Sequence, residues 1–155
     1  MTMTDIKKTL LKIMKSHYPS SKYKYYSKEV VEKFDRPCFF TEISIDSSEP
    51  ASAGADHFLA TFSIEILQAV VDEAAALNIG NTLRTAFGRY FMVKDSSSGK
   101  ERAVKVRNYD FDFIGTDNNV PAIMVTLEWY DRVDKQETAD MMEDVDVSLT
   151  VQVEE

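Results

Sequence analysis

Residues 57–66 read HFLATFSIEI, and from Phe58 onward the even-numbered positions carry most of the large apolar side chains. Successive side chains of a β-strand point to opposite faces of a sheet, so this period of two predicts a strand with one buried face. Residues 38–45, CFFTEISI, alternate in the same way. The two stretches predict an antiparallel hairpin, joined by a long mobile loop over residues 46–56 that is rich in Ser, Ala, Pro and Gly.

Helical spacing of apolar residues lies on both sides of this hairpin. Residues 5–17 follow Thr4, a candidate N-cap, and residues 69–87 precede Gly88, a candidate C-cap. Gly80 interrupts the second helix at a cost of about 1 kcal/mol relative to alanine. It indicates either a neighbour that packs closely against the helix or a tolerated glycine.

Further period-two stretches predict four more strands. They cover residues 23–26, residues 90–93, the stretch from Val104 to Phe113 and the stretch from Ile123 to Trp129. The large side chains change phase near Asn108, which predicts a β-bulge there. The predicted fold class is therefore α+β, with two layers: a mostly antiparallel sheet packed against two main helices. Its long strands leave exposed edges that an oligomer could cover.

Charge is unevenly distributed along the 155 residues, which are enough for one domain. The net charge is −8. Residues 134–155 hold eight acidic residues and one basic residue, a net −7, whereas residues 1–36 carry a net +5. We expect a domain over residues 1–133 and an acidic extension over residues 134–155. This uneven distribution of charge favours contacts between copies of the chain. Alternatively, the charged residues form ordinary solvated surface. Alternating Val and Leu residues from Val145 to Val153 predict that the extension becomes a strand when it meets a sheet edge.

Several classes of function are disfavoured. A net-negative domain with scattered lysines lacks the continuous basic surface that phosphate contacts need, so no nucleic-acid recognition is expected. Apolar runs are far shorter than the ~20 residues of a membrane helix, so no membrane partner is expected either. The single cysteine, Cys38, lies in an apolar run and is predicted to be a buried thiol of a protein made inside the cell.

Catalytic and metal-binding patterns are weak. Neither His17 nor His57 has a second His or Cys at ligand spacing, so we expect no metal site and no cofactor. Asp110 and Asp112 share one strand face, where they could form an acid/base pair or bind a divalent ion. They equally fit the solvent side of a strand. The chain is therefore predicted not to be an enzyme, and a small enzyme that uses these two carboxylates is the remote alternative.

Several local strings, taken in order, resemble a known family. They are the helix Ile6 to Lys15, the strand Tyr23-Lys24-Tyr25-Tyr26, the string Arg36-Pro37-Cys38-Phe39-Phe40, the strand Phe58 to Leu67, the helix 69–87 and the strand Val125-Thr126-Leu127-Glu128-Trp129-Tyr130. Over residues 4–133 the chain resembles the phage tail terminator proteins of prophages and phage-tail-like bacteriocins of Gram-positive bacteria. The acidic extension has no counterpart in this resemblance.

The resemblance implies a ring, expected to be hexameric, at the head-proximal end of a completed tail tube. There it would end tube elongation and offer a docking surface to the neck or head-tail connector, and to the sheath if the tail is contractile. The expected location is the tail of a virion or phage-like particle assembled in the host cytoplasm. A neck or head-completion ring protein of the same particle is the nearest alternative.

Partner contacts are expected in the two polar loops, 46–56 and 94–102, and in the acidic extension. The residues concerned are Glu49, Ser52, Asp56, Lys94, Asp95, Ser97, Lys100, Glu101, Asp140, Glu143 and Asp144. Polar loops of this kind suit a surface that stays soluble until it docks. No catalytic, cofactor-binding or metal-binding residue is expected.

Overall fold

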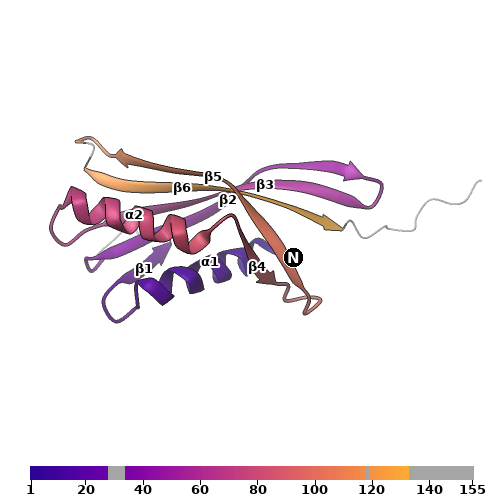
Figure 1. Cartoon of the computed structure of the whole chain (residues 1–155), viewed down its shortest axis with the longest axis horizontal. Helices are drawn as coiled ribbons and strands as arrows, with labels where there is room; N and C mark the ends of the chain where they lie inside the picture. Colours follow the sequence, from indigo (N-terminus) through magenta and orange to yellow (C-terminus); the bar gives the residue numbers. More distant parts are fainter. Residues whose placement is uncertain (28–33, 118, 133–155) are drawn as a thin grey trace, which may run out of the picture.

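The computed structural model describes residues 1–27, 34–117 and 119–132. The elements, in chain order, are α1 (Met3–His17), β1 (Lys24–Ser27), β2 (Cys38–Ser52), β3 (Ala55–Leu67), α2 (Glu73–Phe87), β4 (Tyr90–Lys94), β5 (Glu101–Ile114) and β6 (Val120–Arg132). Figure 1 shows a long, curled sheet with the two helices along it. The predicted α+β class is confirmed.

The six strands form one sheet in the order β1-β2-β3-β6-β5-β4. The predicted hairpin of β2 and β3 is confirmed, with Phe39 opposite Ile66 and Ile43 opposite Phe62. β3 also pairs antiparallel with β6, and β6 with β5. Only β1 is parallel to its neighbour, β2. The sheet is therefore mostly antiparallel, as the alternating sequence predicts.

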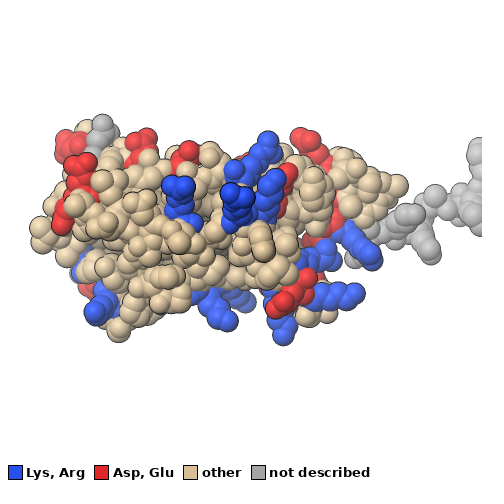
Figure 2. Space-filling model, viewed as in Figure 1, with Lys and Arg blue, Asp and Glu red and all other residues tan. Residues whose placement is uncertain are grey.

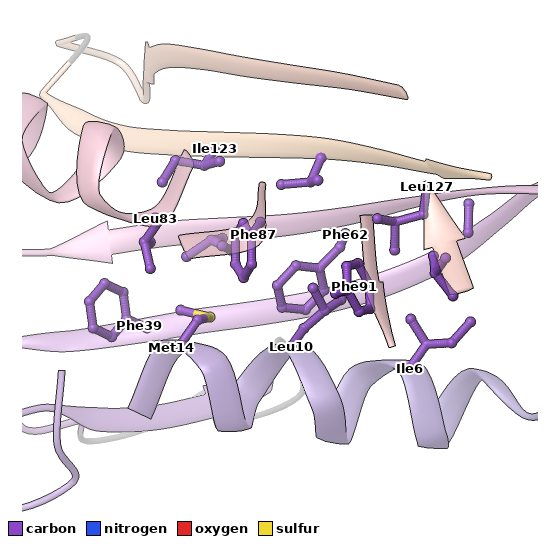
Figure 3. Packing of buried hydrophobic residues seen from close by; sticks show 14 of the residues in the cluster. Ile6, Leu10, Met14, Phe39, Phe62, Leu83, Phe87, Phe91, Ile123 and Leu127 are labelled. Atoms are coloured by element: carbon purple, nitrogen blue, oxygen red, sulfur yellow. The ribbon is translucent and has the colours of Figure 1, made fainter. Parts of the chain in front are cut away.

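Both helices cover the same face of the sheet. The even-numbered residues of β3 from Ala60 to Ile66 are buried, and they meet Leu10 and Met14 of α1 and Leu83 and Phe87 of α2 in one apolar cluster. Figure 3 shows these side chains pointing toward one another between helices and strands. Burying apolar surface in this way contributes about 25 cal/mol per Å². The alternation in residues 57–66 thus determines which face of the sheet becomes the core.

The predicted boundaries of the loop between β2 and β3 are wrong. Residues 46–56 are not a long loop, because β2 and β3 continue their pairing to Ser52 opposite Ala55, with register shifts near Asp46 and Ala51. Most of this polar stretch is a strand extension at the exposed tip of a hairpin. β-pairing of the backbone does not require apolar side chains, so the polar composition did not predict it.

The helix starts also differ from the predictions. α1 is capped by Thr2 instead of Thr4: the Asp5 amide donates to the Thr2 hydroxyl, and the Asp5 carboxylate accepts from the Thr2 amide, a capping box. α2 begins at Glu73 with Asp72 as its N-cap, so Val71 lies outside the helix and is exposed. The buried positions of α2 are Ala76, Ile79, Gly80, Leu83 and Phe87.

The predicted bulge is confirmed in β5. The register with β6 shifts between Val106 and Asn108, which leaves Arg107 as the extra residue. After the bulge, Tyr109 and Phe111 face α2. The Tyr109 hydroxyl donates a 2.7 Å hydrogen bond to the Gly80 carbonyl, and a Cβ placed at Gly80 would lie 2.6 Å from the Phe111 ring. Close packing of helix and strand therefore accounts for the glycine.

β5 is only partly covered on the side that faces away from β6. β4 pairs with Glu101 to Lys105, and the Val106 amide then donates to the Arg89 carbonyl at 2.8 Å. From Arg107 to Ile114, no strand in the described part of the chain pairs with this side. In Figure 1 this half of β5 lies along the upper border of the sheet. The fold thus leaves an open strand edge of eight residues.

Candidate partner-binding surfaces

One end of the sheet gathers segments that are far apart in the sequence. Asp56, near the β2–β3 turn, pairs with Asp131 at the end of β6. The Asp131 carboxylate lies 2.9 Å from the Arg102 guanidinium at the start of β5, and the Met1 amino group lies 2.8 Å from the same carboxylate. Figure 1 shows both hairpin tips and the start of α1 at this end. The two predicted contact loops therefore form one surface.

Asp95 is the exception among the predicted contact residues of the β4–β5 turn. It is only 2% exposed. Its carboxylate accepts hydrogen bonds from the Ser97 amide at 3.0 Å and from the hydroxyls of Ser97 and Ser98 at 2.7 Å each. The bonds from Ser98 and Ser97 hold the pKa of Asp95 well below its usual value. Asp95 therefore organises the turn from inside, while its neighbours are exposed.

The other predicted contact residues are distributed as follows. Glu49 and Ser52 are exposed on the β2–β3 hairpin and Asp56 is half-buried beside them, whereas Lys94, Ser97, Lys100 and Glu101 are exposed at the β4–β5 turn. The exposed positions are open to a partner. Asp140, Glu143 and Asp144 lie outside the described residues.

A second surface, which the sequence analysis did not predict, lies between α2 and the open edge of β5. An open groove of about 760 Å³ is lined by three exposed arginines: Arg84 in the last turn of α2, Arg89 after it, and Arg107 at the bulge. Figure 2 shows basic side chains gathered where β5 passes the C-terminal end of α2. Within the described ranges, none of the three guanidinium groups forms an ion pair with a carboxylate. The groove is therefore a cationic surface, although the charge of Arg107 is one of the smaller causes that lower the pKa of Glu128.

The groove continues along α2 with apolar walls. Its next section lies between Leu77, Gly80, Tyr109 and Phe111, where the Leu77 side chain is 43% exposed. Farther on, Phe113 and the exposed Val71 line another hollow. The groove therefore follows the open edge of β5, with basic side chains at one end and apolar side chains along the rest. The sequence alone does not predict this groove, because Arg84, Arg89 and Arg107 come together only through the packing of α2 against β5.

The face of the sheet away from the helices carries a polar network. Glu128 lies 3.0 Å from the Lys105 amine and 2.9 Å from the His57 ring nitrogen. The hydrogen bond from Lys105, followed by that from His57, holds the pKa of Glu128 below its usual value against the effect of burial. Tyr130 stacks on the His57 ring and is itself exposed. His57 is thus part of a surface network on β3 and β6.

The chemistry of the remaining candidates is limited. Asp110 and Asp112 are both exposed; Asp110 accepts a 2.7 Å hydrogen bond from the Asn108 amide, and Asp112 accepts one from the Phe113 backbone. Among residues 1–27, 34–117 and 119–132, no cluster of three His, Cys, Asp or Glu residues could hold a metal ion. In the same ranges, no helix is long and apolar enough to cross a membrane. Cys38 is a buried free thiol, and its burial raises its pKa.

A family model described as phage tail terminator protein matches residues 5–139, most of the chain. The chain belongs to the phage tail terminator family. The resemblance found in the sequence is thereby confirmed, and membership supports a role in phage tail assembly. It also favours a structural role over catalysis by Asp110 and Asp112.

The chain was also compared with solved structures and with curated proteins. A solved structure whose name states no function matches with a TM-score of 0.50 at 12% sequence identity, covering 88% of this chain and 99% of that one. At this identity the match shows the fold alone. No curated protein matches the sequence. The fold is therefore shared with a solved structure, and the role in tail assembly comes from the family.

Proposed function

We propose that this protein caps the head-proximal end of a phage or phage-tail-like particle tube as a ring of identical subunits, expected to be six. The ring ends tube elongation and presents a docking surface to the neck or head-tail connector, and to the sheath in a contractile tail. The observation that carries the proposal is the family match over residues 5–139. The place of assembly that follows from this role is the host cytoplasm.

The surfaces of the molecule support a ring subunit with partners on more than one side. A closed ring of identical subunits needs two different, complementary surfaces on each subunit. The cationic groove beside the open strand edge of β5 is our candidate for one of these two surfaces. We assign the tips, with the exposed Glu49, Lys94 and Lys100, to the tube or the connector.

Tube length provides the test. Tail tube protein is assembled with and without this protein, and negative-stain microscopy scores tube length and ring density at the tube ends. We expect tubes of limited length with a ring at one end. Tubes of unchanged length with no added density would reject the terminator role, and binding to the portal side with no effect on tubes would indicate a neck or head-completion protein.

A matched pair of variants locates the surface that docks. Lys94→Glu with Lys100→Glu reverses two exposed charges at the β4–β5 tip. Lys22→Glu with Lys24→Glu changes the net charge equally at two exposed positions past the C-terminal end of α1, the end of the helix opposite to that tip. We expect the first pair to weaken capping and the second to cap like the unmodified chain. Equal capping by both pairs would remove the tip from the docking surface.

A further inference from the structure

We propose that the acidic C-terminal segment of a neighbouring copy adds as a strand to the open edge of β5, with its acidic residues at the arginine end of the α2–β5 groove. This contact rests on the proposed function only in that a ring places several copies side by side. The added strand would span residues 146–153 of the neighbouring copy, outside the described residues, and would extend the sheet of the copy that receives it beyond the six described strands.

The open edge is the first observation. β4 stops pairing at Lys105, so the backbone groups of residues 107–114 on that side meet no strand in the described structure. A strand edge of this length is a template for another extended segment. Such an edge is normally short, charged or covered in a stable protein, and covering by a second copy satisfies its backbone groups.

The charge of the groove is the second observation. Arg84, Arg89 and Arg107 are exposed, and none of them forms an ion pair within the described ranges. Residues 134–155 carry a net charge of −7. Guanidinium groups bind carboxylates by charge-assisted hydrogen bonds, so the groove and the segment are complementary.

The pattern of the segment matches the edge in length and in faces. Val147, Leu149, Val151 and Val153 alternate with Ser148, Thr150 and Gln152. Beside β5, whose Tyr109 and Phe111 face α2, the apolar side chains of such a strand would cover the exposed Leu77 and the half-buried Phe113. The polar side chains would lie on the open face with Asp110 and Asp112.

Charge also sets the direction of the added strand. Glu143 and Asp144 come just before the alternating stretch, and the arginines lie where the open edge begins. With the acidic pair at that end, the segment runs parallel to β5. Residues 146–153 then match residues 107–114 in number.

The topology favours a neighbour's segment over the chain's own. β6 passes the bulge, where Leu127 is opposite Val106, and continues away from the open edge to Arg132. To return to Arg107, the same chain would have to pass around β4, which occupies the outer side of β5 from Glu101 to Lys105. A segment from an adjacent subunit meets no such obstacle.

Photo-crosslinking of the full chain tests the contact. A benzoylphenylalanine in place of Asn81, exposed in the groove, is compared with one in place of Ser44, exposed on β2. An equal mixture of nitrogen-14 and nitrogen-15 protein is irradiated, free and bound to tail tubes, and the crosslinked peptides are identified by mass spectrometry. We expect the Asn81 probe alone to capture residues 134–155, with mixed isotopes. Capture within one copy, capture by both probes alike, or no capture in either state would overturn the proposal.

Variants in the segment separate strand addition from simple attraction of charges. Leu149→Pro removes a backbone donor within the proposed strand, and Gln136→Pro makes the same change outside it. We expect the first to lower the crosslink yield at least about tenfold and the second to leave it unchanged. Equal yields from both would reject a strand.

Charge reversal gives a positive control. Arg84→Glu with Arg107→Glu should abolish the crosslink, and Glu143→Arg with Asp144→Arg on the partner copy should restore it. Failure of the second pair to restore the crosslink would reject the proposed direction of the strand. Because crosslinking is scored separately from tube length, a chain that caps tubes without this contact would refute the inference and leave the proposed function intact.

Discussion

The burial of Asp95 was not predicted from the sequence, whereas the close neighbour that Gly80 indicated as one of two alternatives is Phe111. Asp95 lies in a run of serines and was expected at the surface, yet its carboxylate is buried and accepts bonds from Ser97 and Ser98. Gly80 interrupts a helix that needs no bend, yet its missing side chain admits the Phe111 ring. Asp95 thus fixes the shape of the β4–β5 turn, and Gly80 sets how closely α2 approaches β5.

Asp95→Asn should lower the free energy of unfolding at neutral pH. One oxygen of the carboxylate is replaced by an amide donor, so either the Ser97 bonds or the Ser98 bond lose their acceptor. Because the folded-state pKa of Asp95 is depressed, its contribution is present above the ordinary value of 3.8 and is lost as the pH falls below it. The measurement is urea unfolding of both proteins between neutral pH and about pH 2.

Asp110→Asn is the matched control, since Asp110 is an exposed aspartate on the same sheet. Its effect on the free energy of unfolding should stay within about 0.5 kcal/mol. A difference between wild type and Asp95→Asn that persists unchanged at low pH would show that the charge of Asp95 is not the stabilising feature.

Gly80→Ala should destabilise the fold by about 1–3 kcal/mol, although alanine favours helices. The added Cβ would lie 2.6 Å and 2.8 Å from two Phe111 ring atoms, so ring and helix must move apart. Thermal unfolding measures the effect. Asn78→Ala, an exposed change on the same helix, should be neutral or slightly stabilising. A higher melting temperature for Gly80→Ala would mean that Phe111 yields without cost.

Helix ends and strand pairings are determined by local hydrogen bonds that composition describes poorly. α1 starts two residues earlier than Thr4 would place it, because the capping box of Thr2 and Asp5 satisfies the first amides of the helix. The Asp5 carboxylate also accepts from the Ser96 hydroxyl at 3.1 Å, which ties α1 to the β4–β5 turn. These bonds from Thr2 and Ser96 lower the pKa of Asp5 to about 2.

Thr2→Ala should cost about 1 kcal/mol of unfolding free energy, because it removes both side-chain bonds of the Thr2 hydroxyl, the one it accepts from the Asp5 amide and the one it donates to the Asp5 carboxylate. Thr4→Ala, at the position predicted from sequence, should change the stability by less than about 0.5 kcal/mol, since Thr4 is exposed. Chemical denaturation of the two variants compares them directly. Equal losses would contradict the assignment of Thr2 as the cap.

For the molecule as a whole, the core formed by the described residues reaches close to the end of β6. Its buried apolar residues extend from Ile6 to Trp129. A chain that stops at residue 133 should therefore fold with the same helix and strand content and with a free energy of unfolding within about 0.5 kcal/mol of the full chain. Circular dichroism and urea unfolding measure both quantities.

A chain that stops at residue 139, where the family match ends, serves as the control for this truncation. Loss of the fold in the shorter chain but not in the control would move the domain boundary past residue 133. Loss in both would show that the acidic segment is part of the fold. Neither truncated chain should form the crosslink to the α2–β5 groove.

The sequence by itself determined the elements and the buried face. Period-two alternation in residues 38–45 and 57–66, and helical spacing around Leu83, depend only on neighbours along the chain, so these features could be predicted. The bulge near Asn108 was predicted for the same reason, since a change of phase is visible locally. Family membership likewise follows from local strings in their order.

Only the tertiary structure decided which surfaces exist. Three features depend on contacts between residues far apart in the chain: the parallel pairing of β1, the pairing of β4 with β5 only as far as Lys105, and the meeting of Arg84, Arg89 and Arg107. The burial of Asp95 is of the same kind. The spacing of residues along the chain does not predict such contacts, because they form only when the apolar face of the sheet packs and brings separate elements together. The open edge of β5 arises in the same way, since it depends on where the neighbouring elements lie after packing.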